Sequence, residues 1–340
     1  MISVEHLTKC YGTFLAVDDL SFEIGEGHVY GFLGPNGAGK STTMNIMTGC
    51  LSATKGHVRI DGYDIFDQPE QAKRRIGYLP EQPPLYLNET PAEYLRFVGE
   101  AKGLRGAVLA HQINSVIEQT KIGDVQNRRI SALSKGYKQR VGIAQALLGC
   151  PKVIILDEPT VGLDPIQIVE IRDLIRDLGL THTVIFSSHI LSEVQAICDQ
   201  ILMIDRGRLA AFGTPRELEQ QFLSPNELVL ATEMAEEELI GLLSGIEFIS
   251  AAEMEPTAQG RITARVRTEH SDIYEVSRGI FCVFASKGVP LLELTLKKAS
   301  LEDVFLELTD NGTGTDLDAL PDGAEKTESE EDEHGSDIEA

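Results

Sequence analysis

The chain has 340 residues, 42% of them hydrophobic, and carries a formal net charge of −23. A chain of this length holds about two globular domains, because single hydrophobic cores rarely grow beyond roughly 250–300 residues. The strong negative charge repels a phosphate backbone, so we expect no nucleic-acid partner.

The composition also bears on the cellular compartment. The longest apolar runs, such as residues 153–156, are far shorter than the roughly 18–20 residues of a membrane-spanning helix. No basic region followed by an apolar segment stands at the N-terminus, so no secretory signal is expected. Five cysteines, odd in number and widely spaced, are interpreted as reduced packing residues. These features predict a cytoplasmic protein.

The N-terminal region is predicted to be rich in β-strands, because apolar and polar residues alternate over residues 1–33. The apolar run at 29–33 favours a buried strand, and a helix is expected at residues 42–47. Between them, the sequence GPNGAGKST fits the phosphate-binding loop pattern GxxxxGK[ST]. The predicted loop consists of Gly34, Pro35, Asn36, Gly37, Ala38, Gly39, Lys40, Ser41 and Thr42.

This loop predicts a nucleoside triphosphate site. Its glycines let the main chain approach phosphate oxygens, and the N-terminus of the following helix attracts negative charge. Lys40 is expected to reach the terminal phosphates, and Ser41 is expected to bind Mg²⁺. On its own, the loop fits kinases, GTPases, helicases and motor proteins, so it indicates only the class of ligand.

The remaining elements predict an α/β fold followed by a smaller domain. A helical period predicts a helical insert at about 88–150, and alternating strands and helices from 153 to 204 predict a mostly parallel sheet. After a boundary at 224–226, the order of elements favours an α+β ferredoxin-like domain at 226–309, whose second strand is expected at 248–252. The acidic residues 310–340 are expected to be disordered.

Two adjacent carboxylates, Asp157 and Glu158, follow the predicted buried strand at 153–156. Neighbouring side chains on a strand point to opposite sides, so the two acids are expected to have different tasks. Asp157 would bind Mg²⁺, and Glu158 would polarise the attacking water. The alternative is a solvated strand end with an acid that caps a helix.

Residues 133–140, LSKGYKQR, lie between the helical insert and this acidic strand. Here the sequence resembles the ATP-binding subunits of ABC transporters, whose signature segment is usually LSGGQ. The resemblance covers residues 1 to about 222 and implies the P-loop ABC ATPase fold for them. It also implies that Ser134 and Gly136 contact ATP held by a facing subunit. Lys135 and Tyr137 stand where glycine and glutamine are commoner, and the resemblance leaves their effect open.

The resemblance implies roles for four more residues. Tyr11 would stack on adenine, Gln82 would sense Mg²⁺ and the attacking water, and His189 would contact the γ-phosphate. Asp164, in the segment called the D-loop, would contact the facing subunit. Outside this context, Tyr11 would be a packed ring and Gln82 a turn residue. Asp164 would cap the helix that Pro165 opens, and both of its roles can hold together.

Together these features predict ATP and Mg²⁺ as ligands, ATP hydrolysis as the reaction and a nucleotide-sandwich homodimer. With residues 301–305, LEDVF, the chain resembles the bacterial ABC-2-type export branch of drug-resistance, sodium-efflux and gliding-motility ATPases. This resemblance implies a separately encoded polytopic membrane permease, with the chain peripheral on the inner face of the cell membrane. A soluble ABC ATPase that acts on nucleic acid or ribosomes is the alternative.

Overall fold

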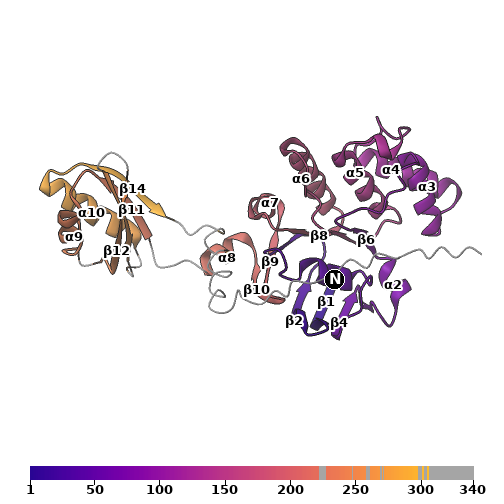
Figure 1. Ribbon diagram of the computed structural model, residues 1–340, viewed down its shortest axis with the longest axis horizontal. Coiled ribbons are helices and arrows are strands. Elements are labelled where there is room, and N and C mark those ends of the chain that lie inside the picture. Colours follow the sequence, from indigo (N-terminus) through magenta and orange to yellow (C-terminus); the bar gives the residue numbers. More distant parts are fainter. Residues whose placement is uncertain are drawn as a thin grey trace, which may run out of the picture.

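The structure of the protein is a computed structural model, shown in Figure 1. It describes residues 1–221, 227–246, 248–257, 261–268, 270, 272–297, 301 and 305. The predicted boundary at 224–226 and the predicted tail at 310–340 lie outside these residues.

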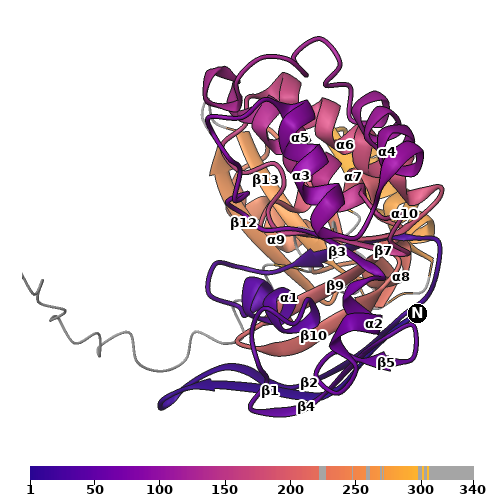
Figure 2. The ribbon, with the colours of Figure 1, turned by 90° about the vertical axis from the view of Figure 1, so that its right-hand side faces the viewer.

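A six-stranded sheet forms the centre of the larger part of the molecule, as Figure 2 shows. Its strand order is β10-β9-β3-β8-β7-β6, and all neighbours are parallel except β10 and β9. Both faces of the central strands are covered, which explains their unbroken apolar runs. The prediction of a mostly parallel sheet is confirmed. The strands are β3 (Val29–Leu33), β6 (Ile76–Leu79), β7 (Val153–Leu156), β8 (Thr183–Ser188), β9 (Gln200–Asp205) and β10 (Arg208–Gly213).

A second, antiparallel sheet with the order β2-β1-β4-β5 confirms the predicted β-rich opening. Helix α1 (Lys40–Met47) lies between the two sheets in Figure 2. One buried apolar cluster, which includes Phe22, Phe32 and Met44, joins α1 to both sheets. The strands are β1 (Ile2–Tyr11), β2 (Phe14–Ile24), β4 (Lys55–Ile60) and β5 (Tyr63–Asp64).

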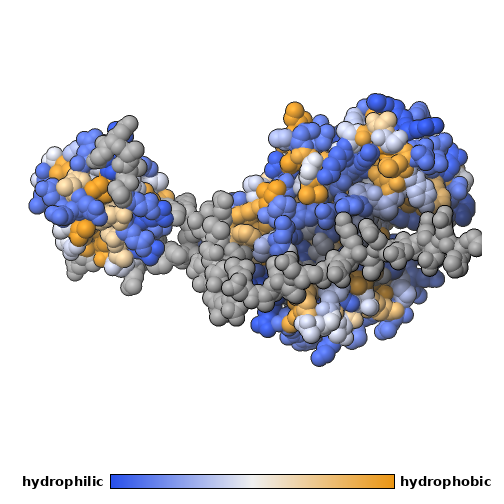
Figure 3. Space-filling view, viewed as in Figure 1, coloured by the Kyte–Doolittle hydropathy of each residue, from blue (hydrophilic) through white to orange (hydrophobic). Residues whose placement is uncertain are grey.

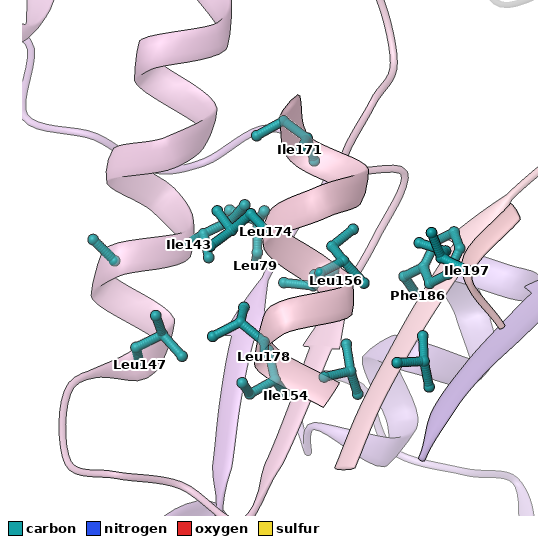
Figure 4. Packing of buried hydrophobic residues seen from close by; sticks show 14 of the residues in the cluster. Leu79, Ile143, Leu147, Ile154, Leu156, Ile171, Leu174, Leu178, Phe186 and Ile197 are labelled. Carbon is teal, nitrogen blue, oxygen red and sulfur yellow. The ribbon is translucent and has the colours of Figure 1, made fainter. Parts of the chain in front are cut away.

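Helices cover the other face of the six-stranded sheet, and the predicted helical insert is confirmed. Figure 4 shows Ile143 and Leu174 from two helices beside Leu79 and Leu156 from two strands, all in one buried cluster. Local capping fixes where the helices begin: Thr90 and Glu93 form a capping box at the start of α3. The helices of this group are α3 (Pro91–Ala101), α4 (Gly106–Gln119), η1 (Ile130–Ala132), α5 (Lys135–Leu147), α6 (Pro165–Gly179), α7 (Leu191–Ile197) and α8 (Pro215–Gln221). Helix α2 (Pro69–Lys73) instead belongs with the α1 side, where Ala72 is part of the cluster that contains Met44.

The C-terminal elements form a third sheet with its own core. The strand order β12-β13-β11-β14, with antiparallel neighbours throughout, is that expected of the predicted ferredoxin-like arrangement. Leu228 and Leu230 on β11 pack in one cluster with Ile280 and Phe284 on α10. The elements are β11 (Glu227–Thr232), α9 (Glu236–Leu243), β12 (Ala251–Thr257), β13 (Arg261–Arg267), α10 (Ile273–Lys287) and β14 (Leu291–Lys297).

The strand predicted at 248–252 is wrong in its position, because β12 spans Ala251–Thr257. Phe248 instead contacts the ring of His270, with ring centroids 4.4 Å apart, and packs on the end of the C-terminal core. The strand itself contains Glu253 and Glu255, whose carboxylates pair with arginines on β13. The prediction followed the apolar residues around Phe248, which pack against the core. The strand itself is stabilised by cross-strand ion pairs, which an apolar pattern does not reveal.

The chain returns to the larger part after β14. Leu301 is fully buried in the same apolar cluster as Leu218 on α8, and Phe305 packs against that cluster. Leu301 and Phe305, the two described residues of the 301–305 segment, therefore contact the core of the larger part.

Candidate functional site

The predicted phosphate loop connects the end of β3 to the start of α1. Gly37 and Gly39 have φ angles of +83° and +100°, a left-handed conformation that glycine adopts most easily. A Cβ atom at Gly39 would lie 2.6 Å from the carbonyl oxygen of Ala16, so this position has no room for a larger residue. The sequence thus produces a curled loop at the N-terminus of a helix, where backbone N–H groups favour anions.

Lys40 lies inside this loop and is only 6% exposed. Its ammonium donates to the carbonyl oxygens of Gly34 at 2.8 Å and Pro35 at 3.1 Å. It also forms an ion pair with Glu158, with 3.6 Å between Nζ and Oε1. The buried charge of Lys40 is therefore compensated by two carbonyls and one carboxylate.

Asp157 joins the phosphate loop to two strands of the sheet. Its Oδ1 atom accepts hydrogen bonds from the Ser41 hydroxyl at 3.1 Å and from the Ser187 hydroxyl at 2.7 Å. Ser187 Oγ in turn accepts a hydrogen bond from the backbone N–H of Glu158 at 2.7 Å. Asp157 is 3% exposed, so these hydrogen bonds stabilise a carboxylate that water barely reaches.

Glu158 stands between the lysine of the loop and the predicted switch histidine. Its Oε2 atom lies 3.0 Å from His189 Nδ1, while Oε1 faces Lys40. The backbone φ of Glu158 is +45°, which is uncommon for a residue other than glycine. Strained backbone of this kind gathers at functional sites, where the surrounding structure holds it in place.

Tyr78 links β6 to the helix that follows the phosphate loop. Its hydroxyl donates to the side-chain oxygen of Asn45 on α1 at 3.1 Å. Burial, together with the nearby Asp157 carboxylate, raises the pKa of Tyr78, so the hydroxyl remains a neutral donor at physiological pH.

A pocket of about 350 Å³ lies at the phosphate loop, and Lys40, Ser41, Glu158 and His189 line it. Sequence reasoning missed Phe14, which is the cross-strand neighbour of Tyr11, although aromatic residues on both sides of the glycine turn were an available signal. It also missed Glu81, directly before Gln82. The lining residues are Tyr11, Phe14, Ala16, Asn36, Gly37, Gly39, Lys40, Ser41, Thr42, Glu81, Glu158, Val161 and His189.

The donor set beside the pocket fits Mg²⁺. Ser41 Oγ and Asp157 Oδ1 are oxygen donors 3.1 Å apart, and Mg²⁺ typically combines one or two such ligands with water and phosphate oxygens. Within the described residues, no three His, Cys, Asp or Glu side chains gather as a metal-binding group.

Comparison with known proteins identifies the family. Residues 17–161 match the ABC transporter family model. The chain is 35% identical to the uncharacterized ABC transporter ATP-binding protein YxlF of Bacillus subtilis, over 91% of this chain and 99% of that protein. It is 34% identical to the bacitracin transport ATP-binding protein BcrA of Bacillus licheniformis, over 92% and 98%. This chain belongs to the ABC transporter ATP-binding proteins.

A solved structure supports the same assignment. The ATP-binding cassette MJ0796, in a dimeric post-hydrolysis state with ADP and Pi, is 26% identical with a TM-score of 0.57 and matches 63% of this chain and 98% of its own. As a member of the family, the chain is an ATP-binding and ATP-hydrolysing subunit. Within the described residues, no helix combines the length and apolar character that crossing a membrane requires.

The predicted signature segment, residues 133–140, spans the N-terminus of α5 and does not line the pocket. Ser134 is the N-cap and accepts a hydrogen bond from the backbone N–H of Tyr137 at 3.4 Å. Gly136 is buried against Gln167 on α6, whose Oε1 would lie 2.5 Å from a Cβ atom at this position. Tyr137, which stands where glutamine is commoner, donates its hydroxyl hydrogen to Asp124 at 2.7 Å.

Two other predicted ABC residues lie outside the pocket lining. Asp164 is the N-cap of α6 and accepts from the backbone N–H of Gln167 at 2.9 Å, so the capping role expected for it is present. Gln82 is exposed in the loop after β6, next to the pocket-lining Glu81. The structure thus brings Tyr11, the phosphate loop, Glu158 and His189 together, and it leaves Ser134, Gly136 and Asp164 elsewhere on the same chain.

Proposed function

We propose that two copies of this chain sandwich two ATP molecules and hydrolyse them to power export through a separately encoded polytopic permease of the ABC-2 type. The observation that carries the proposal is the contact chain from Lys40 through Glu158 to His189 at the mouth of the phosphate loop. Similarity to the bacitracin transport protein over 92% of the chain supports the export assignment.

Within one subunit, each residue of the pocket has a distinct task. Tyr11 would stack on adenine, and residues 34–42 would bind the phosphates through backbone N–H groups. Glu158 would accept a proton from the attacking water, with His189 orienting the carboxylate and contacting the γ-phosphate. Lys40 would neutralise charge on the terminal phosphates.

Mg²⁺ would complete this half of the site. Ser41 and Asp157 would hold it, and Gln82 would respond to it from the loop after β6. When bound, the ion supplies charge neutralisation between the phosphates. Ser187 keeps the Asp157 carboxylate in place through its 2.7 Å hydrogen bond.

The facing subunit would supply the other half. Ser134 and Gly136 at the N-terminus of α5, and Asp164 in the D-loop, are away from the pocket of their own chain. In a head-to-tail dimer they would face the second nucleotide, where a capped helix N-terminus favours negative charge. Two composite sites would then form only when the dimer closes.

An exposed apolar cluster marks the proposed docking site for the permease. Tyr86, Leu87 and Phe97 are 51%, 50% and 50% exposed, and the rings of Tyr86 and Phe97 lie 5.1 Å apart. Figure 3 shows hydrophobic side chains gathered on the lobe that carries α3 and α4, amid a largely hydrophilic surface. The cluster begins four residues after Gln82, so movement at the nucleotide would reach the membrane partner through a short loop.

In this proposal the chain is cytoplasmic and peripheral on the inner face of the cell membrane, where its permease would hold it. Co-expression with a candidate polytopic membrane protein, taken from the neighbouring genes, tests the proposal. We expect the two proteins to purify together in detergent and the permease to change the ATPase rate. A folded, ATP-hydrolysing chain that binds no integral membrane protein would contradict the transport role.

A further inference from the structure

Lys135 occupies the first position of α5, directly after the N-cap Ser134. Its side chain is exposed, and the described residues provide no ion pair for its ammonium. By contrast, Arg140 on the same helix is buried and pairs with Glu170 at 2.6 Å. The positive charge of Lys135 is therefore available to a ligand from outside the chain.

Gly162 in the D-loop provides space for this ammonium. A Cβ atom at Gly162 would lie 2.3 Å from Lys135 Nζ, so a larger residue here would displace the lysine. The preceding residue, Val161, lines the nucleotide pocket of the same chain. The lysine ammonium thus lies beside the loop that follows Glu158 in the chain.

The sequence segment that contains Lys135 is basic, although the chain as a whole is strongly acidic. Residues 121–140 contain six of the 30 basic residues and one of the 53 acidic residues. The nucleotide pocket has the opposite balance, because its described lining includes one lysine, Lys40, and two glutamates, Glu81 and Glu158. Besides His189, the described lining therefore offers a triphosphate no second cationic side chain, lysine or arginine, from its own subunit.

We propose that Lys135 supplies this cation: in the closed dimer it binds the terminal phosphates of the ATP held by the facing subunit. The proposal rests on the sandwich dimer of the proposed function. It assigns a role to the lysine that replaces the usual glycine, beside the serine and the glycine of the signature. Because a charge-assisted hydrogen bond is stronger than a neutral one, Lys135 makes closure depend on a nucleotide with a γ-phosphate.

The test uses the full chain with Glu158→Gln, so that bound ATP persists, and measures the ATP concentration that gives half-maximal dimer by light scattering. Lys135→Gln should raise this concentration roughly 10- to 100-fold, the range of one charge-assisted hydrogen bond. Lys135→Arg should restore it to within about threefold. Arg128→Gln, which removes an exposed charge from the same basic segment, is the matched control and should stay within about threefold.

A second measurement separates a phosphate contact from damage to the fold. Binding of ADP to the monomer should be the same with Lys135 and with Lys135→Gln, because the lysine serves the other subunit's nucleotide. Gly162→Ala should also weaken ATP-driven dimerisation, and its effect should shrink in the Lys135→Gln background, because both changes remove the same contact.

Equal half-maximal ATP concentrations for Lys135→Gln and Arg128→Gln would overturn the role of Lys135, as would equal loss of ADP binding by the monomer. Failure of the chain with Lys135 intact and Glu158→Gln to dimerise with ATP would instead contradict the sandwich dimer itself, and the inference with it.

Discussion

His189 Nδ1 lies 3.0 Å from Glu158 Oε2, and the other oxygen of the same carboxylate lies 3.6 Å from Lys40 Nζ. Glu158 comes from the end of β7 and His189 from the segment after β8, so two neighbouring parallel strands deliver them to one edge of the sheet. His189 contacts one oxygen of the Glu158 carboxylate and Lys40 faces the other, so the two contacts orient the carboxylate.

Replacing His189 with alanine should lower the maximal ATPase rate roughly 100-fold or more, because a misplaced general base loses most of its contribution. ATP binding should change little, since phosphate binding depends mainly on the loop at 34–42. Steady-state kinetics and nucleotide titration measure the two effects. His111→Ala, on the exposed face of α4, is the control and should keep the rate of the unchanged protein. A His189→Ala enzyme with an unchanged rate would remove His189 from the site.

Replacing Tyr11 with alanine should raise the KM for ATP roughly tenfold, because stacking of a base on an aromatic ring contributes about 1–3 kcal/mol. The ring is 48% exposed and lines the pocket beside Phe14. Tyr11→Phe keeps the ring and should retain the KM. If Tyr11→Ala and Tyr11→Phe had the same KM, adenine would stack elsewhere.

Removal of Mg²⁺ with a chelator should abolish turnover, and added Mg²⁺ should restore it. Asp157→Asn should raise the Mg²⁺ concentration needed for half-maximal rate by at least roughly tenfold, because a ligand charge is lost. Ser187→Ala removes one hydrogen bond to Asp157 and should give a smaller shift in the same direction. Full activity of Asp157→Asn at low Mg²⁺ would exclude this carboxylate as a ligand.

Phe97→Asp should prevent co-purification with the permease while the ATPase rate of the isolated chain stays the same. The substitution places a charge in the exposed cluster of Tyr86, Leu87 and Phe97, none of which lines the pocket. Phe281→Asp on α10, at a residue that is 58% exposed, is a matched control and should leave the complex intact. Retention of the complex by Phe97→Asp would show that the permease binds another surface.

Local sequence patterns predicted those parts of the site that are close together in the chain. Residues 29–47 alone predicted the strand, the glycine-rich loop and the helix around Lys40. The apolar run at 153–156 predicted a strand that ends at Asp157 and Glu158. The pairing of Glu158 with His189 required the order of the parallel strands, which a single sequence indicates only through resemblance to a family.

Contacts between distant segments explain what the sequence did not reveal. Strand β6 has only four residues, which is too short for a clear sequence pattern. Its Leu79 is buried with residues of helices that come much later in the chain. Leu301 follows β14 of the C-terminal sheet in the chain, but it is buried in the cluster that contains Leu218 of α8. Neither fact is encoded in local periodicity, because each depends on packing across the fold.

The most direct test of the account is the mass of the purified Glu158→Gln protein in solution, with ATP and Mg²⁺ and without them. The account predicts a monomer without nucleotide, a dimer with ATP, retained nucleotide binding and an ATPase rate lowered roughly 100-fold or more. Glu118→Gln, at an exposed position on α4, should hydrolyse ATP at the rate of the unchanged protein. A Glu158→Gln protein that stays monomeric with saturating ATP, or that hydrolyses ATP at the unchanged rate, would contradict the account.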